Sequence, residues 1–310
     1  MSKYIWADHY RPKSVDDYVF RDDSLREQVK IWIAEKSFPH LLLAGGPGVG
    51  KTTLAHLLLT EMGIEGYDIL HINASRNRGI GDVRDKITNF ISMIPFGPFK
   101  VVFLDEADRL TPEAQDAMKG VIEEYERTSR FILTCNSPNM LILPLRSRLQ
   151  EYHFNSIDQI EFTTRAATIL ISENIEFDID TLDLYVKATY PDLRKCTNLL
   201  QQNSYTGKLA DPREEDSGVT DYKFEMVELF KKGKIIEARK LICSRAQPHE
   251  MSTVFRWLYE NIDLLGSDDE TKDAALLVIK QGLVDNTLCA DPEINLSATL
   301  IKLARLQNRQ

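Results

Sequence analysis

The chain has 310 residues, of which 43% are hydrophobic and 27% charged, and its formal net charge at pH 7 is −9. This length is enough for two or three domains, and the negative charge argues against a protein that coats nucleic acid. Four scattered cysteines without C-x-x-C spacing favour neither a zinc site nor a disulfide framework; they are Cys135, Cys196, Cys243 and Cys289. With no leader pattern and no apolar run of about 18 residues, we expect a soluble cytoplasmic protein.

The first patterned element is an amphipathic helix over residues 24–36, where Ser24 and Glu27 suggest a capping box. An apolar strand over residues 40–44 follows. It leads directly into a match to the phosphate-loop pattern G-x-x-x-x-G-K-[ST], formed by Gly45, Gly46, Pro47, Gly48, Val49, Gly50, Lys51, Thr52 and Thr53. The strand before the pattern favours a nucleotide site over a plain glycine turn.

Each residue type in this loop suits phosphate binding. The glycines let the backbone wrap around phosphates, so that N–H groups point inward at the start of the next helix. We expect Lys51 to reach the β- and γ-phosphates and Thr52 to place its hydroxyl on Mg²⁺, with Thr53 as a second candidate hydroxyl. The loop therefore predicts ATP and Mg²⁺ as cofactors.

A strand over residues 69–72 precedes a local cluster of basic residues, interrupted by two aspartates. The basic residues are Arg76, Arg78, Arg84 and Lys86. They could follow a nucleic-acid backbone through phosphate contacts, and the alternative is a solvated helix face.

Residues 91–99 form an apolar stretch that contains few polar residues. It includes Ile94, Phe96 and Phe99. Exposed apolar clusters mark partner sites, so we expect either a docking surface for another protein or internal packing.

The strand over residues 101–104 ends abruptly in the acidic run of residues 105–108, which we call the acid box. Asp105, at the carboxyl end of the strand, is placed to hold Mg²⁺, and Glu106 is placed to polarise a water for attack on the γ-phosphate. This pair predicts ATP hydrolysis and not nucleotide binding alone. The alternative is that both residues lie in a solvated turn, which could have the same sequence. Thr111 and Pro112 then predict the start of a helix, which carries Lys119.

A further strand over residues 131–134 brings Asn136 to its end, where a neutral amide could orient the attacking water or sense the γ-phosphate. Arg146 and Arg148 come just before a strand over residues 150–154. A guanidinium at this position suggests an arginine finger, and one that comes from a neighbouring subunit would couple hydrolysis to assembly.

Helical patterns replace strands from Ser156, which with Gln159 suggests another capping box. Asp192 is a candidate N-cap that leaves Arg194 in the first helical turn, aimed at the nucleotide, where it could distinguish ATP from ADP. Residues 205–220 lack periodicity and read as a linker, and residues 155–220 hold 6 basic against 12 acidic side chains. The last ninety residues have helical stripes that indicate core or subunit contacts.

These motifs together resemble a AAA+ sliding clamp loader subunit of the replication factor C type, over roughly residues 4–200. Tyr10, Arg11 and Pro12 resemble the adenine-side box of the family. The stretch from Asn73 to Arg84, Ser147-Arg148 and the run from Pro191 to Lys195 resemble three further family motifs. Leu149 replaces the usual cysteine after the arginine, and the short, divergent tail makes the chain most similar to the large subunit of T4-type phage loaders.

The resemblance implies a set of roles and partners. It implies an ATPase that acts with like subunits and a companion subunit in a ring, opens a sliding clamp and sets it on primer-template DNA. It implies that the basic cluster and Lys119 face the DNA, that the apolar stretch presses on the clamp, and that Gln115 couples to the active site. If a phage encodes the chain, the compartment is the host cytoplasm.

The fold expected is an α/β P-loop AAA+ domain with a parallel sheet over residues 1–154, a small helical lid with linker over residues 155–220, and an all-α collar over residues 221–310. The alternatives are a AAA+ branch-migration or helicase-type DNA motor and a non-hydrolysing scaffold subunit of the same ring. The second normally has a degraded phosphate loop or acid box, and both are intact here. Unfoldases of this superfamily have an aromatic pore loop, whereas residues 75–82 contain no aromatic residue.

Overall fold

The computed structural model describes residues 4–76, 80–154, 156–212, 222–246, 248–266, 268–286 and 288–307. The chain divides into two compact units, Met1–Glu173 with Thr189–Gln201 and Asn174–Ala188 with Gln202–Gln310. This division describes packing, and the three parts expected from the sequence, residues 1–154, 155–220 and 221–310, remain a prediction. Within the described residues, no helix is both long and apolar enough to cross a membrane.

The first unit is built on a five-stranded sheet in the order β2-β3-β4-β1-β5, and its strand pairs are all parallel. The strands are β1 (Leu41–Gly45), β2 (Ile69–Asn73), β3 (Lys100–Asp105), β4 (Ser129–Cys135) and β5 (Gln150–Phe154). Each expected strand is present within two residues of its predicted bounds. Because the strands are parallel, their carboxyl ends meet at one edge, where ligands bind in folds of this kind.

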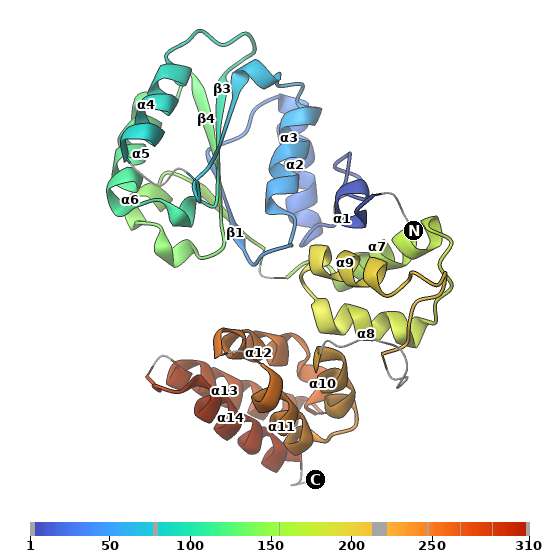
Figure 1. The fold of residues 1–310 in the computed structure, drawn as a ribbon. Coiled ribbons are helices and arrows are strands. Elements are labelled where there is room, and N and C mark those ends of the chain that lie inside the picture. Colours follow the sequence, from blue (N-terminus) through green and yellow to red (C-terminus); the bar gives the residue numbers. More distant parts are fainter. Residues whose placement is uncertain are drawn as a thin grey trace. The chain divides into compact units, whose positions relative to one another are not determined.

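Helices cover both faces of this sheet. In Figure 1, α2 (Asp23–Glu35) and α3 (Lys51–Glu61) lie on one face, and α4 (Ile80–Ile91) and α5 (Pro112–Glu124) on the other. Consecutive residues of β3 alternate between the two cores: Val101 and Phe103 pack in one cluster, and Val102 and Leu104 in the other. Burial on both faces explains why these strands read as continuous apolar runs.

The remaining elements of the first unit are short helices and the helices after the sheet. They are α1 (Trp6–His9), η1 (Gly66–Asp68), η2 (Ala107–Arg109), η3 (Pro138–Met140), α6 (Leu143–Arg146), α7 (Gln159–Ser172) and α9 (Leu193–Gln202), the last residue of which falls in the second unit.

Aspartate side chains set two helix starts differently from the sequence prediction. The α2 helix is capped by Asp22, whose carboxylate accepts from Leu25 N at 2.8 Å, so Ser24 is not the cap. The α7 helix is capped by Asp158, which accepts from Glu161 N at 2.8 Å, so Ser156 is not the cap either. In both cases an aspartate close by in sequence offers the backbone a charged acceptor, which makes the stronger hydrogen bond.

Among its described residues, the second unit has helices as its regular elements, together with loops and an isolated bridge between Glu176 and Lys208. It contains α8 (Ile179–Thr189, apart from its last residue), α10 (Tyr222–Lys231), α11 (Ile235–Arg245), α12 (Pro248–Glu260), η4 (Ile262–Leu264), α13 (Asp269–Asn286) and α14 (Pro292–Gln307). Its buried side chains include Phe230, Phe255 and Leu300, so the apolar stripes predicted for this region form a core.

His40 joins the start of β1 to β4, because its Nδ1 accepts from Phe131 N at 3.2 Å. Burial, helped by the positive charge of Arg130, lowers the pKa of His40 to about 4. The folded state therefore favours the neutral ring. This contribution to stability is complete above pH 6.5 and is lost as the pH falls from 6.5 towards 4, because the unfolded chain takes up the proton first.

We expect this histidine to make about 2 kcal/mol of the free energy of unfolding pH-dependent, a figure reduced for the partial exposure of the ring. The measurement is chemical denaturation at several pH values from 7.5 to 4.5, compared with His40→Gln, which keeps an acceptor and does not titrate. The difference between the two proteins should shrink by that amount in acid. A difference that stays constant across this range would contradict the prediction.

Candidate functional site

The phosphate loop connects β1 to α3 at the carboxyl edge of the sheet. Two of its glycines have left-handed backbone angles, with φ of 72° at Gly48 and 90° at Gly50. A Cβ at Gly48 would lie 1.7 Å from a carboxylate oxygen of Asp192, and one at Gly50 would lie 2.8 Å from the hydroxyl of Tyr18. Glycine is therefore needed at both positions for conformation and for space. The α3 helix begins at Lys51, so its free N–H groups and dipole face the loop.

Lys51 is buried beneath this loop, with 8% of its surface exposed. Its Nζ donates to the carbonyls of Gly45 and Gly46 at 2.8 and 2.6 Å, and to Oδ1 of Asn136 at 3.2 Å. Burial lowers the pKa of this ammonium from its ordinary value. These three hydrogen-bond acceptors are all neutral, so phosphate oxygens would be stronger partners for the ammonium.

Oxygen atoms of three residues meet beside the loop. Thr52 Oγ1 donates to Asp105 Oδ1 at 3.0 Å, and Thr134 Oγ1 donates to the same oxygen. A hydroxyl and a carboxylate in contact are hard donors of the kind that Mg²⁺ takes, together with substrate phosphates. Among the described residues no cluster of three or more His, Cys, Asp or Glu side chains could hold a metal ion.

Glu106 follows Asp105 in a left-handed conformation, with φ of 57°. Its backbone N–H donates to Thr134 Oγ1 at 3.1 Å, which fixes this uncommon conformation. In the described part of the chain its carboxylate has no recorded hydrogen bond or ion pair, and the residue lines the same cavity as Lys51. A free carboxylate beside the phosphate site can accept a proton from water.

Asn136 lies at the end of β4, directly opposite the phosphate loop. Its side chain contacts Lys51, and its backbone N–H donates to Asp108 Oδ2 at 3.2 Å. Ser137 N donates to the same oxygen at 3.1 Å. The last acidic residue of the acid box therefore holds the loop that presents Asn136.

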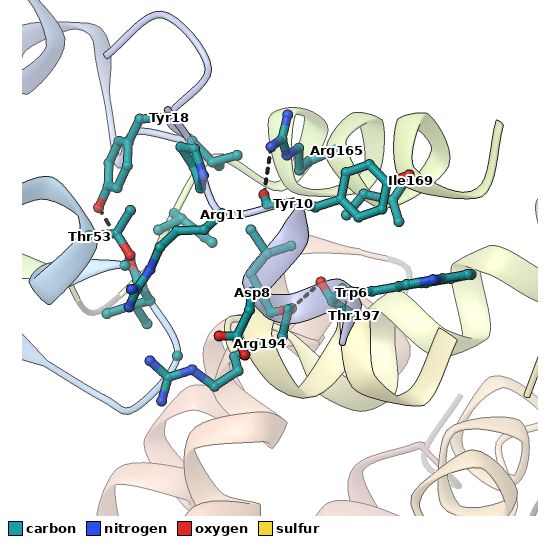
Figure 2. Close-up of a pocket in the computed structure, with 18 residues that line it drawn as sticks. Trp6, Asp8, Tyr10, Arg11, Tyr18, Thr53, Arg165, Ile169, Arg194 and Thr197 are labelled. Atoms are coloured by element: carbon teal, nitrogen blue, oxygen red, sulfur yellow. Dashed lines mark hydrogen bonds between the residues drawn. The ribbon is translucent and has the colours of Figure 1, made fainter. Parts of the chain in front are cut away.

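Two cavities share this edge of the sheet. One, of 210 Å³, is lined by the phosphate loop with Asp105, Glu106 and Asn136. The other, of 130 Å³, is shown in Figure 2 and is lined by apolar and aromatic side chains together with the Tyr10-Arg11-Pro12 box. Arg11 and Arg194 line both cavities. A polar cavity and an apolar one with lining residues in common suit a triphosphate joined to a flat base.

The Tyr10-Arg11-Pro12 box is held in place by side chains of α7 and of its C-cap residue. Arg165 Nη2 donates to the carbonyl of Tyr10 at 2.8 Å, as Figure 2 shows, and the Tyr10 hydroxyl donates to Glu173 Oε1 at 2.7 Å. Burial, together with the Glu173 carboxylate, raises the pKa of Tyr10 to about 12. The tyrosine therefore remains a neutral donor and wall of the cavity at neutral pH.

Asp192 caps α9 as predicted, since its Oδ1 accepts from Lys195 N at 2.8 Å. The same carboxylate packs on Gly48, so the start of α9 rests on the phosphate loop. Arg194 is consequently held at the junction of the two cavities, and neither it nor Arg11 has a recorded carboxylate partner in the described chain. Two guanidinium groups without a salt bridge favour an anion at this point, although the Asp192 carboxylate lies near Arg194.

Gln115 is buried in α5, where both its side-chain amide nitrogen and its side-chain oxygen form hydrogen bonds. Its Nε2 donates to the carbonyls of Leu110 and Met140, each at 3.1 Å, and its Oε1 accepts from Ile142 N at 2.8 Å. Gln115 thus ties α5 to the segment that follows Asn136. The Thr111 cap predicted for this helix is confirmed by its hydrogen bond from Ala114 N at 3.3 Å.

Arg148 lies outside both of these cavities. It lines a separate open groove of 590 Å³ with residues that precede β1, β4 and β5, at the amino ends of the strands. Its guanidinium pairs with Glu123 of α5. Arg148 is therefore not part of the nucleotide site of its own chain.

The predicted DNA-binding residues lie on or near α4 and α5. Arg76, Arg84 and Lys86 are exposed, and Arg78 lies outside the described residues. Lys119 forms an ion pair with Asp116 of the same helix at 2.9 Å, which compensates its charge.

The apolar stretch before β3 divides into an exposed and a buried part. Ile94 is 88% and Phe96 80% exposed, and Phe96 contacts the half-exposed ring of Tyr67. Phe99 is 5% exposed and packs against Phe38, so the prediction that it belongs to a contact surface is corrected here. Its position next to β3 turns its ring into the core. We call Tyr67, Met93, Ile94 and Phe96 the apolar patch.

A buried ion pair supports the apolar patch. Asp68 accepts from the backbone N–H groups of Phe96 and Gly97 and pairs with Lys100 at 2.8 Å. These contacts lower the pKa of the Asp68 carboxyl, against the opposing effect of its burial. An exposed apolar loop whose backbone is held by such contacts would need little reordering on binding.

Sequence reasoning missed several residues of the site. Thr134, Asp108 and Arg165 act on predicted residues through hydrogen bonds, and Trp6 contributes to the wall of the base-sized cavity. The position of Thr134 two residues before Asn136, at a strand end, was a usable signal. No sequence signal connects Arg165 to Tyr10, because 155 residues separate them.

Comparison with known proteins gives two kinds of similarity. Residues 41–156 match the family described as ATPase family associated with various cellular activities (AAA). The chain is 35% identical to the replication factor C small subunit of Sulfurisphaera tokodaii, over 97% of this chain and 95% of that protein. It is 33% identical to the replication factor C small subunit of Archaeoglobus fulgidus, over 98% of each. Neither relative comes from a phage, so the narrower resemblance to T4-type phage loaders has no support from them.

Among solved structures, the chain is similar to the RuvB Holliday junction branch migration motor of Thermotoga maritima. The TM-score is 0.55 at 21% identity, over 77% of this chain and 82% of that one. A structure of a single-residue variant of the same RuvB protein has a TM-score of 0.57 at 19% identity, over 81% of this chain and 91% of that one. At this level of identity the likeness concerns the fold alone.

Proposed function

The chain belongs to the replication factor C small-subunit family of AAA ATPases, and on this basis we propose how its nucleotide site serves a sliding clamp loader in DNA replication. The protein is an ATPase subunit of such a loader. The proposal is that ATP with Mg²⁺ assembles a state that grips clamp and DNA, and that hydrolysis releases both. The partners are like subunits, a distinct companion subunit, the clamp and primer-template DNA.

One observation carries this proposal: side chains of the types that ATP hydrolysis requires line a single cavity. The set consists of Lys51, Thr52, Asp105, Glu106 and Asn136. An intact set of this kind argues against a scaffold subunit that only binds nucleotide. The likeness to a branch-migration motor is confined to the fold, so it does not favour the motor.

In this mechanism each side chain has one task. Lys51 would leave the carbonyls of Gly45 and Gly46 to bind the β- and γ-phosphates, and Arg11 and Arg194 would bind phosphate oxygens from the other side. Thr52 and Asp105 would hold Mg²⁺, which would neutralise charge on the phosphates. Glu106 would accept a proton from the attacking water, while Asn136 orients that water near the γ-phosphate.

The test is ATP turnover by the purified chain with its companion subunits. It compares no DNA, single strands, blunt duplex and primer-template junctions, each with and without a ring clamp. We expect strong stimulation by junction and clamp together. Stimulation by branched or single-stranded DNA regardless of clamp would favour the motor, and tight ATP binding without turnover in the complete complex would favour the scaffold.

We expect the DNA stimulation to depend on exposed basic residues of α4. Charge reversal at Arg84 and Lys86 should weaken stimulation by primer-template DNA about 10-fold and reduce its salt dependence, because each lost phosphate contact reduces counterion release. The measurement is turnover against DNA concentration at several salt concentrations. Lys240→Glu, which reverses an exposed charge on α11, is the control. If DNA stimulates the charge-reversal variants and the control equally, with the same salt dependence, α4 is not part of the DNA interface.

We also expect the apolar patch to bind the clamp. Replacing Ile94 and Phe96 with serine should weaken clamp binding by 10-fold or more, since well-exposed apolar anchors commonly contribute about 2 kcal/mol each, while turnover without clamp should remain unchanged. Ile31→Ser removes an exposed apolar side chain from α2 and should have no effect. Titration of labelled clamp measures the affinity. If the serine variant binds the clamp as tightly as the unmodified protein, the apolar patch does not contact the clamp.

A further inference from the structure

The guanidinium of Arg148 is fixed by three neighbouring groups. Its Nε donates to Glu123 Oε1 at 2.7 Å, and its Nη2 donates to the same oxygen. Its Nη1 donates to the carbonyl of Pro144 and lies 3.5 Å from Ser147 Oγ. An arginine side chain on a surface is normally mobile, so this degree of restraint requires an explanation.

Stability does not explain the contact. The side chains are 29% and 53% exposed, and ion pairs with this exposure contribute little to folding because water and salt screen them. The geometry has a different consequence, which is orientation. The carboxylate takes one edge of the guanidinium, formed by Nε and Nη2.

A donor remains available on the guanidinium for a second anion. It carries five N–H bonds, and its hydrogen bonds use one at Nε, one at Nη2 and both at Nη1, the bond to Ser147 being the longest, which leaves one. The remaining donor lies on the terminal nitrogen Nη2. A held arginine with a free terminal donor is prepared to contact a phosphate that another molecule brings.

The helix that carries Glu123 connects this arginine with the chain's own active site. The α5 helix starts after the acid box, and Gln115 in its first half ties it to the segment that follows Asn136. Glu123 lies in its last turn. One rigid helix of 13 residues thus spans from the nucleotide side of the sheet to Arg148.

We propose that Glu123 is a positioning residue that orients the Arg148 guanidinium for the γ-phosphate bound by a neighbouring subunit. This inference rests on the arginine-finger role that the sequence suggests for Arg148 in a neighbour's site, a trans role that we include in the proposed function. Glu123 does not touch the nucleotide itself and acts only through the arginine. Restraint before assembly means that the arginine loses less conformational freedom when the neighbour docks.

The test uses Glu123→Ala in the complete loader complex, with clamp and primer-template DNA. We expect kcat for ATP to fall about 10-fold with KM within twofold, because misorientation affects the transition state and not nucleotide binding. Glu123→Gln keeps an acceptor oxygen and should lose less. Glu124→Ala removes the adjacent exposed carboxylate and should leave kcat within twofold of the unmodified complex.

A double variant separates positioning from a merely structural role. Glu123→Ala combined with Arg148→Ala should be no slower than Arg148→Ala alone, since Glu123 has nothing left to orient. Losses that multiply would overturn the inference, as would a kcat for Glu123→Ala equal to that of Glu124→Ala. A rise in kcat would also overturn it, because it would mean that Glu123 sequesters the arginine.

Different results would contradict the trans role of Arg148 and the positioning role of Glu123. If Arg148→Ala leaves turnover unchanged, the trans role in the proposed function fails, and the inference about Glu123 fails with it. If Arg148→Ala is slow and both Glu123 variants match the control, only the inference fails. Should Glu123→Ala not assemble, the Glu123→Gln complex decides the outcome by the same comparison.

Discussion

Replacing Glu106 with glutamine should leave ATP binding intact and lower ATP turnover by at least about 100-fold. A general base typically contributes a factor of 10² to 10⁴, and glutamine has the same shape without the ability to accept a proton. The substitution is mild for the structure, because the conformation of residue 106 is held by its backbone hydrogen bond to Thr134. The measurements are nucleotide affinity by titration and steady-state turnover in the assembled complex.

The matched control for this experiment is Glu113→Gln, an exposed carboxylate in the first turn of α5 that should leave turnover unchanged. Loss of ATP binding in Glu106→Gln would show that the residue has a structural role. Turnover close to that of the unmodified protein would assign the base to another group.

Removing the Arg148 side chain should lower turnover at a neighbouring subunit's site by about 10³-fold or more, which is the usual effect of losing an arginine finger. ATP binding by the altered chain itself should be unchanged, because Arg148 lies outside both cavities of its own nucleotide site. Arg127→Ala is the matched control, since Arg127 is an exposed arginine that lines the same groove.

Mixing two inactive variants distinguishes action in trans from action in cis. In complexes assembled from Glu106→Gln and Arg148→Ala chains at equal amounts, about a quarter of the interfaces would join an intact Glu106 to an intact Arg148 from the next subunit. Partial recovery of turnover is therefore expected. A mixture as inactive as its two components would exclude the trans role.

Much of the site could be predicted because its motifs are local. The phosphate loop is a contiguous run, and Asp105, Glu106 and Asn136 each follow a buried strand directly. In a parallel sheet the carboxyl ends of such strands meet at one edge, so recognising the strands was sufficient to bring these residues together. The contact between Lys51 and Asn136, which are 85 residues apart, follows from the neighbouring positions of β1 and β4.

Predictions failed where several residues could fill one role. Ser24 and Ser156 satisfy the capping pattern, yet Asp22 and Asp158 take the cap positions, and the pattern alone does not decide between neighbours. Phe96 and Phe99 look equivalent in the sequence, and only the packing of β3 against the core buries one and exposes the other. Burial of a single side chain depends on which other residues pack against it, and this is a property of the whole fold.

The amino-acid sequence alone predicts a loop suited to phosphates, an acid pair suited to metal and water, and strands that bring both to one edge of a sheet. These features depend on short spacings and on the alternation of apolar runs with helices. The supporting contacts depend on tertiary packing and have no local sequence signal: they are Thr134 with Glu106, Asp192 on Gly48 and Glu123 with Arg148. Their partners are 25 or more residues apart, so the order of strands and the packing of helices, not local propensity, bring them together.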